Sequence, residues 1–326
     1  MLVRYFRQNQ PAVLVLLLPL LLLLWPGASP VPDPFARLAA GMPGYSALRW
    51  LFGFSAWLFP VLSFLLVAGL SLQLNFTVNE SELFERRNYL PALLLPLLLS
   101  LFPQGLVPDP TLAGMPFVIW AMRRLWATQG DARILGPLFD AGLLIGLAAV
   151  FYLPYAFLVV VLWSSLAVMR PFHWREYLLP LLGLVLMFFL IWGTLHLLAP
   201  GAWNPSASWR PALLPAKLTP PHWLRGVLLS ALAIIFLVSG VFVFAAGYAR
   251  GIMREKNTRA SFLAFTFTCG LLALFNWFVE GRVPPALVAV PVAVFLSWPL
   301  LQARRIAWAE LGVVAIIALG AWGRWG

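Results

Sequence analysis

The sequence predicts an all-α protein, a polytopic membrane helix bundle with about eleven transmembrane helices in a single domain over residues 1–326. Composition is the first observation behind this prediction: 62% of the residues are hydrophobic and 10% are charged, whereas soluble domains are about one quarter charged. The second observation is that apolar runs recur along the whole chain, separated by charged or Pro/Gly-rich breaks. Each run should be helical, because lipid cannot hydrogen-bond an open backbone.

The first apolar run follows Arg4 and Arg7 and resembles a signal peptide. It lacks a clean small-x-small cleavage site, and Pro30 obstructs cleavage after Ser29, so we predict an uncleaved first span. Several of the later runs are short and interrupted by proline, which is typical either of cavity-lining segments or of tilted helices in a thinned bilayer. The predicted spans lie near 11–25, 50–73, 89–102, 114–126, 136–151, 153–169, 177–198, 226–248, 260–278, 284–301 and 308–322.

The 22 basic residues behind the net charge of +11 are divided unevenly between the two sides of these spans. With the N-terminus inside, the inner segments hold 15 basic residues: Arg4, Arg7, Arg86, Arg87, Arg123, Arg124, Arg133, Arg170, Arg175, Arg250, Arg254, Lys256, Arg259, Arg304 and Arg305. The outer segments hold seven: Arg37, Arg49, Arg210, Lys217, Arg225, Arg282 and Arg324. This bias follows the positive-inside rule. It predicts a cytoplasmic N-terminus, no nucleic-acid partner, and a topological role for the cluster at 250–259.

The outer segments carry the candidate binding residues. Two of them, 26–49 and 199–225, are long and rich in proline and aromatic residues, so we expect them to lie along the membrane surface. The outer acids are Asp33, Asp109 and Glu280. The cations that could pair with a lipid phosphate are Arg37, Arg210, Lys217, Arg225 and Arg282. The alternative is that these cations anchor the chain to anionic headgroups.

Familiar catalytic motifs of soluble enzymes are absent from the sequence: it has no phosphate-binding glycine loop, no His-Glu-x-x-His and no Gly-x-Ser-x-Gly. The single cysteine, Cys269, excludes a disulfide within the chain and a cysteine-based metal site. The three histidines lie in separate segments, which argues against a haem or a histidine metal site. We therefore expect no resident cofactor.

The features from about 83 to 183 follow one another in a specific order. Arg86-Arg87 precedes a short span ending at Ser100-Leu-Phe-Pro103, followed by an outer loop with Asp109-Pro110. A second short span ends at Arg123-Arg124, and the segment 141–148 then leads into a tight hairpin at Tyr152-Leu-Pro-Tyr155. This order resembles the membrane module of the C-type (GT-C) glycosyltransferases.

Three further motifs are spread over the chain: Phe6-Arg7-x-Asn9-x-Pro11, the segment 170–176 and Arg304-Arg305-x-x-Trp308-x-Glu310. Through them the chain is similar over its whole length to an uncharacterised family of multi-pass inner-membrane proteins of Bacteroidota.

The resemblance implies a GT-C-like fold and transfer of a sugar from a polyprenyl-phosphate carrier at the outer face of a bacterial inner membrane. Eleven spans that start from an inner N-terminus predict a periplasmic C-terminus. Asp33, the acid of the first outer loop, would be the catalytic base. Asp109 or Glu280 would orient the sugar or a bound divalent metal. Two departures stand out: Pro34 follows Asp33 where related enzymes present an acidic pair, and the hairpin at 151–155 lacks a cation.

These departures keep two other function classes open. A non-catalytic envelope assembly or scaffold subunit would bind lipid or a protein partner through its tryptophan-rich outer segments. A transporter would need paired polar residues at mid-membrane, and the sequence offers few beyond Asp140.

Overall fold

The computed structural model describes residues 2–8, 11–24, 42–52, 58–102, 106, 109–129, 134–198, 203, 244–245, 248, 253–280, 283–303 and 306–325. These residues form helices and connecting segments, with no strand among them. The helices are α1 (Leu2–Phe6), η1 (Pro11–Leu16), α2 (Leu17–Leu24), α3 (Pro43–Phe52), α4 (Leu58–Glu80), α5 (Leu90–Leu101), α6 (Pro110–Trp126), α7 (Leu135–Phe151), η2 (Leu153–Leu158), α8 (Val159–Met169), α9 (Trp174–Leu198), α12 (Met253–Glu280), α13 (Pro285–Gln302) and α14 (Ile306–Trp325). The predicted all-α class is therefore confirmed for the described part of the chain.

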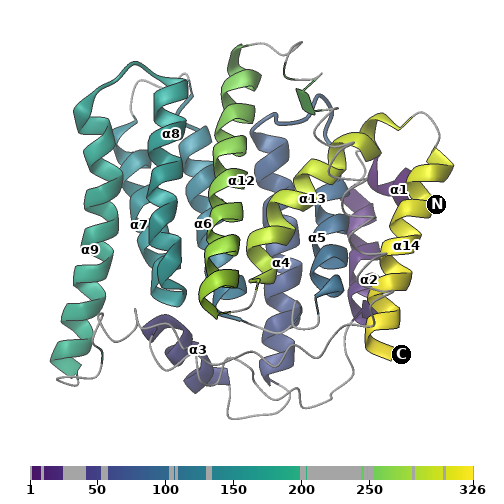
Figure 1. Cartoon of the computed structure of the whole chain (residues 1–326), viewed down its shortest axis with the longest axis horizontal. Helices are drawn as coiled ribbons and strands as arrows, with labels where there is room; N and C mark the ends of the chain where they lie inside the picture. Colours follow the sequence, from purple (N-terminus) through teal and green to yellow (C-terminus); the bar gives the residue numbers. More distant parts are fainter. Residues whose placement is uncertain are drawn as a thin grey trace.

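Most of these helices run side by side in one bundle, with α9 at one edge and α14 at the other (Figure 1). Helix α7 lies between α6 and α9, and α13 packs against α5 and α12. Among the described residues, four helical segments are long and apolar enough to cross a membrane: Pro60–Glu80, Trp174–Leu198, Met253–Phe278 and Pro285–Gln302. Shorter apolar helices account for most of the other predicted spans. The total of eleven spans stays a prediction, and most of the eighth, at 226–248, lies outside the described residues.

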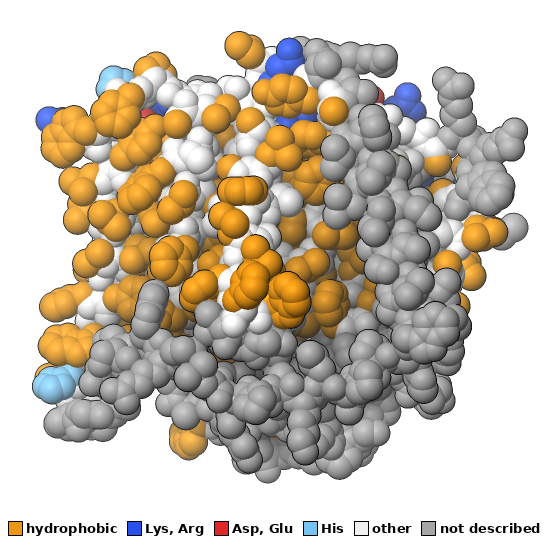
Figure 2. Space-filling view, viewed as in Figure 1, with side chains coloured by type: hydrophobic (Ala, Val, Ile, Leu, Met, Phe, Trp, Pro, Cys, Tyr) orange, Lys and Arg blue, Asp and Glu red, His pale blue; other side chains and the backbone are white. Residues whose placement is uncertain are grey.

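Helix α9 shows which surface of the bundle faces lipid. Only 11% of its most apolar window is buried inside the protein. Large side chains such as Phe189, Leu190 and Trp192 are exposed on it, and hydrophobic side chains cover this side of the molecule in the space-filling view (Figure 2). A contiguous apolar surface of this extent is unfavourable in water. The helix therefore supports the assignment of the chain as a membrane protein.

The predicted span at 50–73 differs from the structure. It is divided between α3, which ends at Phe52, and α4, which begins at Leu58 and continues to Glu80. Helix α3 lies across the end of the bundle rather than along it (Figure 1). Tyr45 is fully buried, whereas Trp50 is 79% exposed. Sequence hydropathy merged the two helices because α3 ends in an apolar turn that continues directly into the next apolar run.

The segments predicted to lie inside meet at one end of the bundle. Arg123 on α6 forms an ion pair with Glu80 on α4, with 2.7 Å between Nε and the carboxylate oxygen. The Arg170 guanidinium donates to the carbonyl of Thr128 at 2.9 Å. Arg7 donates to the carbonyl of Ala303 at 3.1 Å. Lys and Arg side chains are visible at this end in Figure 2. The described helices thus alternate in direction as the charge distribution requires, and the side of the membrane that this basic end faces stays a prediction.

Candidate functional site

Asp109 lies at the opposite end of the bundle, the end predicted to face outside, and caps α6. Its Oδ1 accepts a hydrogen bond from the backbone N–H of Leu112 at 2.6 Å, and its Oδ2 accepts one from the Thr111 hydroxyl at 2.7 Å. An aspartate at this position satisfies one of the N–H groups that a helix start leaves unpaired. The capped helix begins at Pro110, four residues before the predicted span at 114–126. The Asp109 side chain is buried, with only 3% of the residue exposed.

The hairpin between α7 and η2 packs directly on this cap. The Tyr155 hydroxyl donates to the carbonyl of Thr111 at 2.7 Å. The Tyr155 ring packs closely against Gly114, where an added Cβ would come within 2.8 Å of the ring. Tyr152 meets the Tyr155 ring edge-on at 5.2 Å between centroids. The structure therefore joins two of the outer features on which the GT-C resemblance depends, the loop with Asp109 and the tyrosine hairpin.

Burial raises the pKa of Asp109 from 3.8 to about 6, against the opposing effect of its hydrogen bonds to Thr111 and Leu112. Because the folded-state pKa lies above the unfolded value, the protonated carboxyl favours folding, and this contribution is lost as pH rises from about 4 through about 6. The loss is on the order of 3 kcal/mol at neutral pH, since each pKa unit corresponds to about 1.4 kcal/mol. Burial therefore destabilises the ionised Asp109 carboxylate, although the same carboxylate caps α6.

Replacing Asp109 with asparagine tests this interpretation. Asparagine keeps an oxygen acceptor for the Leu112 N–H but cannot ionise, so Asp109→Asn should remove the fall in thermal midpoint between pH 4 and pH 6.5 and should be the more stable protein at pH 7. Asp109→Ala loses both hydrogen bonds and should be less stable than Asp109→Asn by roughly 1 kcal/mol or more. A pH profile of unfolding in detergent that is identical for the parent and Asp109→Asn would contradict the assignment.

The other predicted site residues are placed as follows. Glu280 is the last residue of α12, and its side chain lies outside the described residues. The remaining candidates also lie outside the described residues: Asp33, Arg37, Arg210, Lys217, Arg225 and Arg282. Their predicted roles stay predictions. Within the described part of the chain, no three His, Cys, Asp or Glu side chains lie close enough together to hold a metal ion.

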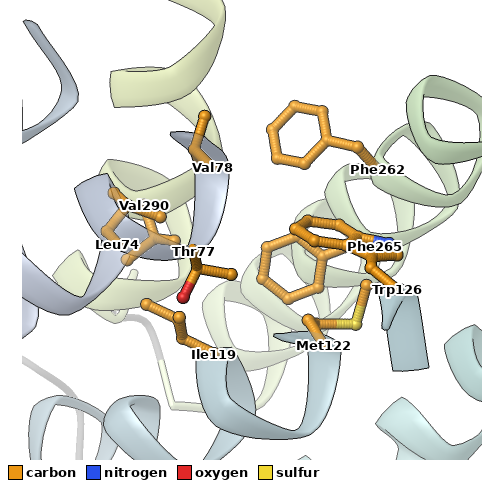
Figure 3. Close-up of a pocket in the computed structure, with 9 residues that line it drawn as sticks. All are labelled: Leu74, Thr77, Val78, Ile119, Met122, Trp126, Phe262, Phe265 and Val290. Atoms are coloured by element: carbon orange, nitrogen blue, oxygen red, sulfur yellow. The ribbon is translucent and has the colours of Figure 1, made fainter. Parts of the chain in front are cut away.

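An apolar crevice lies between α4, α6, α12 and α13 and is too small for a substrate. Figure 3 shows Thr77 on α4 facing Ile119 and Met122 on α6, with Phe262 and Phe265 of α12 closing the other side. The space holds about 10 Å³, which is at most one water molecule. The Trp126 indole, which also borders it, donates to the Ser261 hydroxyl at 2.8 Å, and that hydroxyl lies 2.6 Å from the Ser165 hydroxyl. This part of the bundle is therefore a packed interface between α6, α8 and α12.

Sequence reasoning missed two features of the described structure. Tyr155 was considered only as part of an uncharged hairpin, although its hydroxyl makes the contact with the α6 cap. Arg259 was grouped with the charge cluster of a cytoplasmic loop, but only 2% of it is exposed. No apolar pattern could have revealed this burial, because the first turns of α12, which begins at Met253 rather than at the predicted 260, are polar. Comparison with known proteins adds no further assignment, since no family model, curated protein or solved structure matches the chain.

Proposed function

We propose that this protein is a GT-C-like membrane enzyme that transfers a sugar from a polyprenyl-phosphate carrier at the outer face of a bacterial inner membrane. The observation that carries the proposal is the contact between Tyr155 and Thr111, next to Asp109. It brings the outer loop and the hairpin of the 83–183 pattern into one structural unit. Helices α6 and α7 pack against each other beside this contact.

In the proposed reaction, the Asp33 carboxylate accepts the proton of an acceptor hydroxyl. The hydroxyl oxygen attacks the anomeric carbon of the sugar and forms the new glycosidic bond. The bond between that carbon and the phosphate oxygen breaks, and its electron pair stays on the leaving polyprenyl phosphate. Cations of the outer segments stabilise this charge, with Arg210, Lys217, Arg225 and Arg282 as the candidates.

Asp109 has a different place in this proposal from the one that the resemblance implies. Both of its carboxylate oxygens are engaged by Thr111 and Leu112, and the side chain is buried. It is therefore assigned to holding the outer loop on α6, and contact with the sugar or a metal is left to Glu280. Arg37, four residues after Asp33, is assigned to the same outer surface.

Turnover of a labelled donor tests the proposed activity. The full chain, reconstituted in nanodiscs, is incubated with a radiolabelled polyprenyl-phosphate hexose in the presence and absence of bacterial membrane lipid as acceptor. Native mass spectrometry reports donor binding, and chromatography reports the polyprenyl phosphate released. We expect binding together with release above a protein-free control. Donor binding without release of polyprenyl phosphate would instead favour the scaffold alternative. If neither binding nor release is detected, the protein does not act on this lipid.

A further inference from the structure

At the basic end of the bundle, a cavity of about 310 Å³ lies between α1, the α4–α5 loop, α12 and the end of α13. Its described lining consists of Arg7, Glu85, Arg86, Arg259, Trp298, Leu301 and Gln302. Three guanidinium groups and one carboxylate therefore border a space at the lower end of the volume range of small-ligand sites. The cavity is at the other end of the bundle from Asp109 and is independent of the proposed transferase activity.

Arg259 is the most unusual residue of this lining. Its side chain is only 2% exposed, and its Nε and Nη1 have no hydrogen-bond partner among the described residues. Its Nη2 lies 3.7 Å from the Glu255 carboxylate, which is itself partly exposed. A buried guanidinium that leaves two nitrogens unpaired is costly. Such a group is stable where an anion completes its hydrogen bonds.

The other walls of the cavity fit an anionic group that enters from the membrane interface. Arg7 is fixed by its hydrogen bond to the carbonyl of Ala303, while Arg86 is exposed at the rim. Trp298 contributes an apolar wall that is supported by Phe84, at 4.8 Å between ring centroids. Basic pockets between membrane helices are typical binding sites of lipid phosphates, and the planar guanidinium matches phosphate oxygens in pairs.

We propose that this cavity binds a phosphate group, with Arg259 as its buried anchor and with Arg7 and Arg86 completing the site. The phosphate belongs either to an anionic lipid of the adjacent leaflet or to a soluble phosphate compound. Glu255 competes with this ligand for Arg259, because its carboxylate approaches the guanidinium in the structure.

Two binding measurements distinguish the sources of the phosphate. In detergent, the thermal midpoint of the full chain is followed as inorganic phosphate or pyrophosphate is added at constant ionic strength. In nanodiscs, binding of phosphatidic acid is counted by native mass spectrometry in a phosphatidylcholine background. If the thermal midpoint rises with the soluble anions, the natural ligand is a soluble phosphate compound. If only phosphatidic acid binds, the ligand is a lipid. Either result supports the site.

Four substitutions test the residues. Arg259→Gln should weaken binding of the responding probe by about tenfold or more, since a charged hydrogen-bond donor is lost. Arg86→Gln, at the rim, should weaken binding of the probe less than Arg259→Gln. Because it leaves the buried Arg259 in place, it also tests the site if Arg259→Gln fails to fold. Glu255→Gln removes the competing carboxylate and should tighten binding. Arg124→Gln, an exposed arginine outside the cavity lining, is the matched charge control and should bind like the parent.

The proposal is overturned if neither the soluble anions nor phosphatidic acid binds the parent protein above background. It is equally overturned if Arg86→Gln and Arg124→Gln weaken binding to the same extent, because the basic end would then attract anions without a defined site. Glu255→Gln tests the role of Arg259 itself. If this variant is less stable than the parent and binds anions equally well, Glu255 alone neutralises the Arg259 guanidinium, and the role of Arg259 as the phosphate anchor is overturned.

Discussion

Gly142→Ala should destabilise the folded protein by about 2–3 kcal/mol, although it adds a single methyl group. Gly142 on α7 lies against Pro180 on α9, and a Cβ at this position would overlap the Pro180 carbonyl oxygen and come within 2.6 Å of the Pro180 Cα. Gly183 makes the reciprocal approach, since its Cβ would meet the Phe139 carbonyl oxygen at 2.5 Å. Because the clash is with backbone atoms, no side-chain rotation relieves it, and the two helices must separate.

The same helix supplies the control. Gly193 on α9 has no atom within 4 Å of an added Cβ, so Gly193→Ala should be neutral or stabilising by up to about 1 kcal/mol through helix propensity. Both variants are compared with the parent by reversible unfolding in mixed micelles. Equal stability of Gly142→Ala and Gly193→Ala would show that the close α7–α9 contact, which small residues allow between membrane helices, does not contribute to stability.

Asp33→Asn should reduce release of polyprenyl phosphate from the labelled donor by about 100-fold or more, because general-base catalysis contributes roughly 10²–10⁴-fold to the rate of such a step. Asparagine has a similar shape but cannot accept the proton of the acceptor hydroxyl. Binding of the donor should change little, since its phosphate is held by the outer cations. The measurement is the ratio of release rates, with donor binding followed in parallel by native mass spectrometry.

Asp109→Asn is the matched control for this experiment, because it removes an outer acid whose oxygens are committed to the α6 cap. It should retain turnover at the temperature of the assay. A parent-like release rate for Asp33→Asn would exclude Asp33 as the base. A loss of turnover for Asp109→Asn, with stability unchanged, would return Asp109 to the site at which the sugar or a metal binds.

Helices could be predicted well from the sequence where their signal is local. The spans near 89–102, 136–151 and 153–169 correspond to α5, α7 and η2–α8 within a residue or two at each end. Errors occurred where apolar composition does not mark a helix end. Met253 begins α12 seven residues before the predicted span because the polar first turns of the helix, including Arg259, are not apolar enough to be recognised.

The candidate site was less predictable, because its contacts join residues that are distant in the chain. Tyr155 reaches Thr111 across 44 positions, and Trp126 reaches Ser261 across 135. The acid Asp109 could be recognised in an outer loop, but its burial and its role as a helix cap depend on the hairpin that covers it. Asp33 and the outer cations lie outside the described residues, so their roles stay predictions from the sequence.

The sequence by itself determined the membrane class, the helical secondary structure and the excess of basic residues in alternate connecting segments, because each depends on local composition and on the cost of exposing backbone to lipid. Only the tertiary structure decided which polar groups are satisfied. It buried Arg259 with two unpaired nitrogens, enclosed Asp109 in its cap and brought Gly142 onto the backbone of α9. Burial and pairing arise from helix packing, so residues of the same type along the chain differ in chemistry once the helices meet.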